Sequence, residues 1–126
     1  MPLIYVRDDA RRRVTVTAIG DITMNDAISI LDRRVIDGVW SYALLYDGRQ
    51  RTSVMEAQEV RILVELTRTL SARHGLPGPM ALVRQDATGF GMSRMFGILS
   101  EEARFEVSVF RTIEEAEAWL DSALST

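Results

Sequence analysis

The chain has 126 residues, 47% hydrophobic and 26% charged, which is the size and composition of one globular domain. The formal net charge of −3 argues against nucleic-acid binding, because neutralising phosphates requires a basic surface. There is no cysteine, and all 15 basic residues are arginine, which excludes disulfides, thiolate chemistry, cysteine-bound metals and lysine Schiff bases.

Two strands and a helix open the predicted fold. Alternation of apolar and polar residues predicts strands over residues 3–7 and 13–19, joined by a charged turn. Thr23 begins a capping pattern for a helix that should end at Gly38. The continuously apolar segment 42–46 then predicts a central strand that is covered on both faces.

The rest of the chain alternates helices with strands. Ser53 and Glu56 have the spacing of a capping box, so we predict that Ser53 caps a long helix ending near residue 73. The order β-β-α-β-α-β-α-β-α predicts one α/β domain spanning residues 1–126, with a mostly parallel sheet opened by an antiparallel hairpin. Its remaining elements are a strand at 80–83, a helix around 92–99, a strand at 105–109 and a helix from Thr112.

Three segments carry a family resemblance. They are VTVTAIGDIT at 14–23, MEAQEVR at 55–61 after a strand ending in Asp47, and FGMSRMF at 90–96 with a later VFR at 109–111 and AEAWL at 116–120. In this order they resemble the SpoIIAA-like (STAS-like) fold of anti-sigma antagonists and, more narrowly, small stand-alone bacterial proteins without an assigned activity. The anti-sigma antagonists carry a phosphorylatable serine in an Asp-Ser-Ser-Gly-type motif. That motif is absent here, so the resemblance implies a fold rather than a phosphorylation switch.

Polar residues after the central strand are the first candidate binding site. Arg49, Arg51 and Thr52 precede the long helix, whose N-terminus attracts anions. Ligands of α/β sheets usually bind at the C-terminal edge of the strands, so loops 47–53 and 85–92 could hold an anionic or lipid-like small molecule. A solvated surface loop is the plainer interpretation of the same arginines.

Ser53 also has two interpretations. It could accept a phosphoryl group at the helix N-terminus beside the arginines, where the added charge would be favoured. Its role in a capping box with Glu56 explains both residues without modification, and we favour the cap.

Gly89 and Gly91 follow a strand and precede a helix, as the glycines of a dinucleotide-binding loop do. Arg94 occupies the position of the third glycine of that fingerprint, and the segment comes late in the chain. We therefore interpret these glycines as a loop that leads into a helix, still available to contact a small ligand.

Catalytic and metal-binding patterns are not apparent. His74 is the sole histidine, and its position at the end of the long helix suits an interaction with the helix dipole. Adjacent acidic residues on a helix point apart and make poor acid–base pairs. We therefore expect no enzyme, metal or cofactor. The N-terminus lacks a signal-peptide pattern and no apolar run could span a bilayer, so we expect a cytoplasmic protein without membrane insertion.

The long helix carries two apolar stripes. One contains Val60 and Val64, while the second contains Met55, Ile62 and Leu66, roughly 120° around the helix. The second stripe either packs on a neighbouring helix or meets a partner, most simply a second copy of the chain. Our first hypothesis is a regulatory or protein-interaction domain that forms a homodimer, or binds another protein, through this stripe. The alternative is a small-molecule binder.

Overall fold

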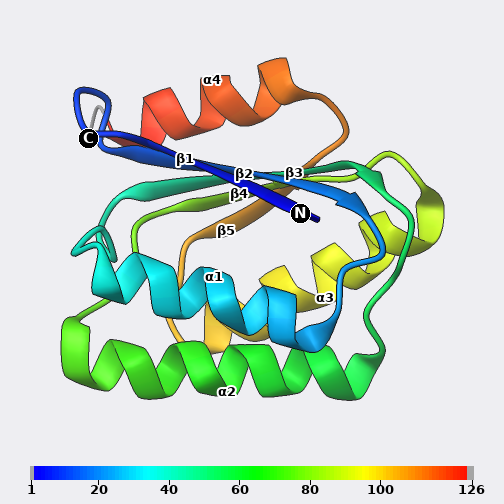
Figure 1. Ribbon diagram of the computed structural model, residues 1–126, viewed down its shortest axis with the longest axis horizontal. Helices are drawn as coiled ribbons and strands as arrows, with labels where there is room; N and C mark the ends of the chain where they lie inside the picture. The colour runs from blue at the N-terminus through cyan, green and yellow to red at the C-terminus, as the bar shows by residue number, and fades with distance from the viewer. Residues whose placement is uncertain (1, 125–126) are drawn as a thin grey trace.

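A computed structural model describes residues 2–124 of the chain. Across these residues, five strands form one sheet with three helices on one face and one on the other (Figure 1). The strands are β1 (Leu3–Asp8), β2 (Arg13–Gly20), β3 (Ala43–Arg51), β4 (Met80–Val83) and β5 (Val107–Phe110), and the helices are α1 (Met24–Ile36), α2 (Ala57–His74), α3 (Ala87–Glu102) and α4 (Ile113–Leu124).

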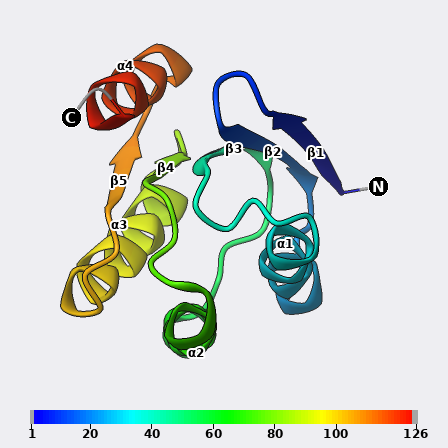
Figure 2. The ribbon, with the colours of Figure 1, turned by 90° about the vertical axis from the view of Figure 1, so that its left-hand side faces the viewer.

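The sheet has the strand order β1-β2-β3-β4-β5, in which only the β1–β2 pair is antiparallel. Because the strands are added in one direction, right-handed crossovers place α1, α2 and α3 on the same face (Figure 2). The opposite face carries α4, which contacts β3, β4 and β5. The predicted element order and the mixed sheet are confirmed.

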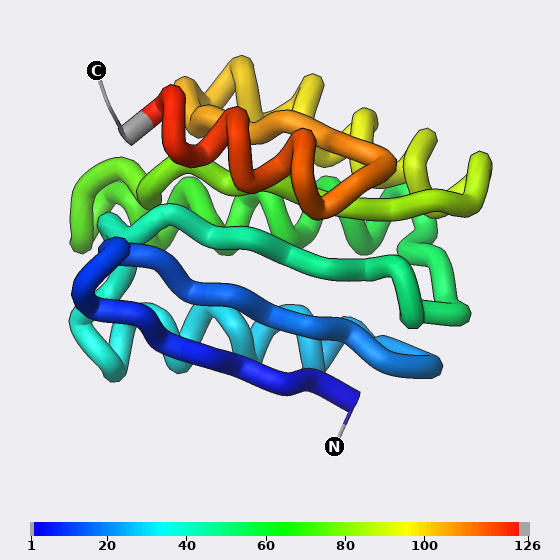
Figure 3. The backbone as a smooth tube through the Cα atoms, turned by 90° about the horizontal axis from the view of Figure 1, so that it is seen from above, coloured from blue at the N-terminus to red at the C-terminus, as the bar shows by residue number. Residues whose placement is uncertain are grey.

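Core residues occupy both faces of the central strands. Leu44 packs in the cluster beneath α1–α3, and its neighbour Leu45 packs in the cluster beneath α4. This confirms that the central strand is covered on both faces. Because α4 does not extend over β1 (Figure 3), Ile4 and Val6 of this edge strand stay 48% and 55% exposed on that side.

Strand β3 is longer than predicted, because segment 47–51 continues the strand instead of forming a loop. Thr17 pairs with Asp47 but Ile19 pairs with Gln50, so β3 contains a bulge with one extra residue. An extra residue reverses the alternation of side chains, and Arg51 therefore joins the face that carries α1–α3. The sequence alternation alone would place Arg51 on the opposite face.

The predicted capping role of Ser53 is wrong. Helix α2 begins at Ala57, Glu56 is the N-cap residue, and Glu56 N donates to Glu59 Oε1 at 3.0 Å. Ser53 Oγ instead accepts from Ile22 N at 2.9 Å and donates to Ile22 O at 3.2 Å. The capping pattern recurs three residues later. Ser53, in the connection from β3 to α2, instead holds the connection between β2 and α1.

Helix α2 is the outermost element on its face. Its principal neighbours are α1 and α3, on either side of it, and no strand is among them (Figure 2). Side chains such as Val60 and Val64 must therefore reach across to the core, where both are buried. The distance between α2 and the sheet is what leaves room for a cavity.

Candidate functional site

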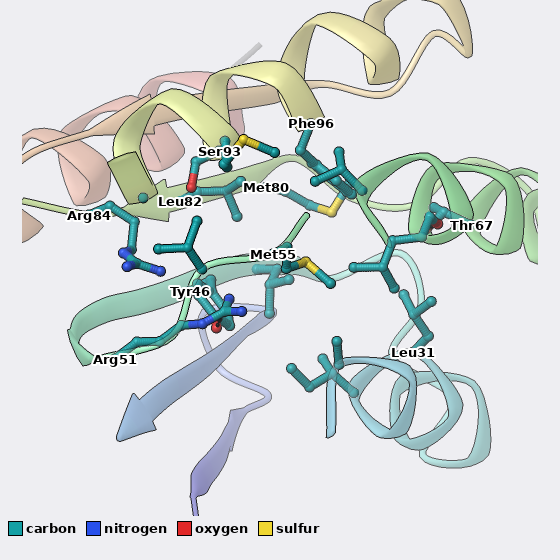
Figure 4. Close-up of a pocket in the computed structure, with 18 of the residues that line it drawn as sticks. Leu31, Tyr46, Arg51, Met55, Thr67, Met80, Leu82, Arg84, Ser93 and Phe96 are labelled. Atoms are coloured by element: carbon teal, nitrogen blue, oxygen red, sulfur yellow. Dashed lines mark hydrogen bonds between the residues drawn. The ribbon is translucent and has the colours of Figure 1, made fainter. Parts of the chain in front are cut away.

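A cavity of about 120 Å³ lies between the sheet and helices α1, α2 and α3. Its walls are mostly apolar, and its ends differ. Arg51 and Arg84 lie at one end, while Leu31 and Thr67 lie at the other (Figure 4). Its further lining residues are Ala27, Ile30, Arg34, Leu44, Tyr46, Val54, Met55, Val60, Leu63, Met80, Leu82, Gly89, Met92, Ser93 and Phe96.

Arg51 is the guanidinium that the bulge of β3 directs to this cavity. Its Nη1 donates to the hydroxyl of Tyr46 at 3.1 Å, and its Nε donates to Ser53 Oγ at 3.2 Å. Burial raises the pKa of Tyr46, so this hydroxyl remains protonated at neutral pH. Arg51 forms no ion pair with any residue in the described range, which leaves its positive charge uncompensated.

Arg84 lies beside Arg51 but is already neutralised. Only 3% of the residue is exposed, and its guanidinium forms an ion pair with Asp86 at 2.9 Å. Its Nη1 and Nη2 each donate to Ser53 O at 3.3 Å. Two glycines make room for it, because a Cβ at Gly48 would lie 2.5 Å from Arg84 Cδ and a Cβ at Gly89 would overlap the guanidinium.

Gly89 and Gly91 belong to the first turns of α3, which corrects their assignment to a loop. Asp86 is the N-cap, and its Oδ2 accepts from Gly89 N at 2.8 Å. Desolvation raises the pKa of Asp86, but the hydrogen bond from Gly89 N and the interactions with Arg84 outweigh it, and the pKa lies below its ordinary value. Gly91 has no neighbour within 4 Å of a built Cβ and does not line the cavity.

Arg34 is the third guanidinium of the cavity, and it is fully buried. Its Nη2 donates to Trp40 O at 3.1 Å and to Tyr42 O at 3.4 Å. Its Nε and Nη1 have no hydrogen-bond partner among the described residues. Burial lowers the pKa of Arg34 to about 10, which still leaves the group protonated at neutral pH.

Several predicted site residues lie away from the cavity. Arg49 is exposed and forms an ion pair with Asp47 at 2.9 Å, and Thr52 is exposed as well. His74 is the last residue of α2 and is also exposed. Of the residues predicted to bind a ligand, Arg51 and Gly89 line the cavity, and Ser53 contacts both arginines at its end.

The second stripe of the long helix is shorter than predicted. Met55 precedes α2 and lines the cavity, because the helix begins at Ala57 and not at Ser53. Ile62 is 42% exposed and Leu66 is half-buried. The surface proposed for self-association is therefore reduced to Ile62 and the exposed edge of Leu66.

Sequence reasoning missed Arg34 and Arg84. Arg34 could have been found, because it lies three and seven residues after Leu31 and Ala27, on the same helical face as these apolar side chains. A charged residue within an apolar stripe is a signal of a buried polar site. Arg84 directly follows β4, but only the tertiary structure places Gly48 and Gly89 around it.

The site favours binding of an anion with an apolar body. Donor groups are gathered at one end, the walls are apolar, and no carboxylate or histidine is among the described residues that line it. Within residues 2–124, no group of three or more His, Asp or Glu side chains is placed to hold a metal ion. The described part of the chain also contains no helix with the length and apolarity of a membrane span.

No family model and no curated protein matches the chain. Among solved structures, it is similar to the crystal structure of an uncharacterized protein of the DUF3478 family with a SpoIIAA-like fold from Shewanella loihica PV-4. The two share 18% sequence identity, with a TM-score of 0.57, over 94% of this chain and 91% of that chain. This likeness confirms the predicted SpoIIAA-like fold.

Two glycines of α3 provide a matched test of the Arg84 environment. We expect Gly97→Ala to raise the free energy of unfolding by about 0.5–1 kcal/mol, because alanine favours the helix and a Cβ there meets only Val107 Cγ1 and O, at 3.8 and 3.9 Å. Gly89→Ala should lower it by about 1–2 kcal/mol, because Arg84 must leave its partners. Urea unfolding measures both, and a stabilised Gly89→Ala protein would contradict this packing.

Replacing the buried guanidinium tests whether Arg34 is a structural residue. We expect Arg34→Met to raise the free energy of unfolding by about 1–2 kcal/mol, because it removes a buried, uncompensated charge. Trp40 O keeps a second donor, Gly78 N, at 3.2 Å. Urea unfolding of the purified variant measures the change. A clear loss of stability would mean that the bonds to the carbonyls outweigh the desolvation of the charge.

Proposed function

We propose that this SpoIIAA-like domain is a non-enzymatic binding protein for a small organic acid. The apolar body of the acid occupies the cavity beneath α1–α3, and its carboxylate is bound by Arg51. The observation that carries the proposal is an apolar cavity of about 120 Å³ with an uncompensated guanidinium at one end.

The volume of the cavity limits the size of the ligand. An apolar cavity of about 150 Å³ stays dry and binds benzene, so a cavity of about 120 Å³ suits a short acyl chain or a single ring. Leu82, Met92 and Phe96 are among the side chains that would contact this apolar body. Methionine adapts readily to different guests, which supports a binding role for this lining.

The charged end of the ligand is argued from the donors around Arg51. Arg51 has no acidic partner among the described residues, whereas Arg84 is paired with Asp86, so a carboxylate gains most at Arg51. The end of the cavity also lies at the carboxyl ends of the parallel strands β3 and β4, where α/β sheets generally bind ligands. Ser93 supplies a further hydroxyl from α3.

Binding is favoured over catalysis because the cavity offers no proton acceptor for its hydroxyls. Tyr46, Thr67 and Ser93 line it, but no histidine or carboxylate does among the residues described. A hydroxyl nucleophile requires an adjacent general base. Thr67 Oγ1 moreover donates to Leu63 O at 2.8 Å within its own helix.

Titration with linear monocarboxylates tests the proposal. Affinity should rise about fourfold for each added methylene, at about 0.8 kcal/mol per group, until the cavity is filled. Arg51→Gln should weaken binding about tenfold or more, because it removes the charge-assisted bonds to the carboxylate. Isothermal titration calorimetry with butanoate to octanoate measures both effects.

Arg49→Gln is the matched control, since Arg49 lies on the same strand but is paired with Asp47 outside the cavity. It should bind the acids as the wild type does. Equal losses for the two variants would assign the effect to general surface charge. No binding of any acid to the wild-type protein would refute the proposed function.

Self-association is the second candidate, supported by apolar side chains that remain exposed. Ile62 of α2 is 42% exposed, and Val6 of the uncovered strand β1 is 55% exposed. We expect Ile62→Glu to shift the mass in sedimentation-velocity experiments toward the monomer, because a charge cannot be buried in an apolar interface. Val6→Glu is the comparison. If only Val6→Glu dissociates the protein, the interface lies on β1, and a monomeric wild type refutes both.

A further inference from the structure

Arg34 lines the cavity from α1, away from the strand ends at which the proposed function places the carboxylate. Arg34 lies one turn beyond Leu31 on α1, and its Nη2 donates to the carbonyls of Trp40 and Tyr42, which precede β3. Arg51 is the last residue of the same strand. The two uncompensated guanidiniums therefore belong to opposite ends of the cavity.

Arg34 shows the features of an unfilled binding group. It has no exposed surface, yet Nε and Nη1 have no hydrogen-bond partner among the described residues. A buried donor without a partner is costly, and a buried charge without a counter-ion is more so. The ring of Trp40, 5.0 Å from Cζ, offers a cation–π contact but no negative charge.

Two positive charges along the cavity lack a negative partner among the described residues. Three arginines line it, and no acidic residue does among the described part of the chain. Asp86 neutralises Arg84, whereas Arg34 and Arg51 form no ion pair within the part of the chain that the structure describes. A ligand that balances the cavity carries one negative charge at each end and an apolar body between them.

We propose that the natural ligand is a small dicarboxylic acid with an apolar middle, and that Arg34 binds its second carboxylate. This inference rests on the proposed function, because it assigns a second binding group in the same cavity. Arg51 binds the first carboxylate at the strand ends, and the apolar side chains contact the methylene groups. Nε and Nη1 of Arg34 then gain acceptors, and the buried charge gains a counter-ion.

Paired titrations at equal carbon number test the inference. Calorimetry compares glutarate, adipate, pimelate and suberate with pentanoate, hexanoate, heptanoate and octanoate. At the length that spans the cavity, the diacid should bind at least tenfold more tightly than its monoacid. Without a partner at the inner end, the second carboxylate would be buried unpaired, and the diacid would bind more weakly at every length.

Arg34→Met identifies the group responsible. It should reverse the preference, so that the monoacid binds at least as tightly as the diacid. Arg33→Met is the matched control, because Arg33 is the exposed neighbour on α1 and does not line the cavity. Thermal unfolding establishes that each variant is folded, and Arg34→Gln replaces Arg34→Met if the latter is not.

The outcomes separate this inference from the proposed function. Monoacids that bind while no diacid binds more tightly would overturn the inference and leave the proposed function intact. A diacid preference that survives loss of the Arg34 guanidinium would also overturn it. Absence of binding by both series would overturn the proposed function itself. A diacid that binds more tightly than its monoacid to the wild-type protein, but not to the Arg34 variant, would support both.

Discussion

The guanidinium of Arg84 is the interaction on which the site depends. It connects the end of β4 to the β3–α2 connection through Ser53 O, and to the start of α3 through Asp86. Gly48 and Gly89 leave the space it occupies. Because Asp86 neutralises this charge, the neighbouring Arg51 is the guanidinium at this end of the cavity that lacks an ion pair among the described residues.

The position of α2 is the second constraint. A helix that packed directly on β3 and β4 would fill the space between them with its own side chains. Here α1 and α3 flank α2 and keep it apart from the sheet (Figure 2), so the apolar face of the helix lines a cavity. The cavity of about 120 Å³ beneath the three helices is the result of this arrangement.

Two arginines of the cavity lack a counter-ion among the described residues, which opposes the stability of the fold. Arg34 and Arg51 carry charges that no acidic residue in the described range neutralises, and the fully buried Arg34 also has two nitrogen atoms without hydrogen-bond partners there. An apolar residue at position 34 would give the folded protein a higher free energy of unfolding. In the proposed function, the bound acid supplies the negative charges that these guanidiniums lack.

The sequence determined the order of the elements, the mixed sheet and the double coverage of β3, because hydrophobic periodicity and helix boundaries are local patterns. It also placed Arg51 and Ser53 in a candidate site. It could not place the bulge in β3, since a bulge depends on pairing with β2, and so it assigned segment 47–51 to a loop. The cavity, with Arg34 at one end and Arg51 at the other, was decided by tertiary structure alone. It arises from how far three helices stand from a sheet, a distance that no local pattern encodes.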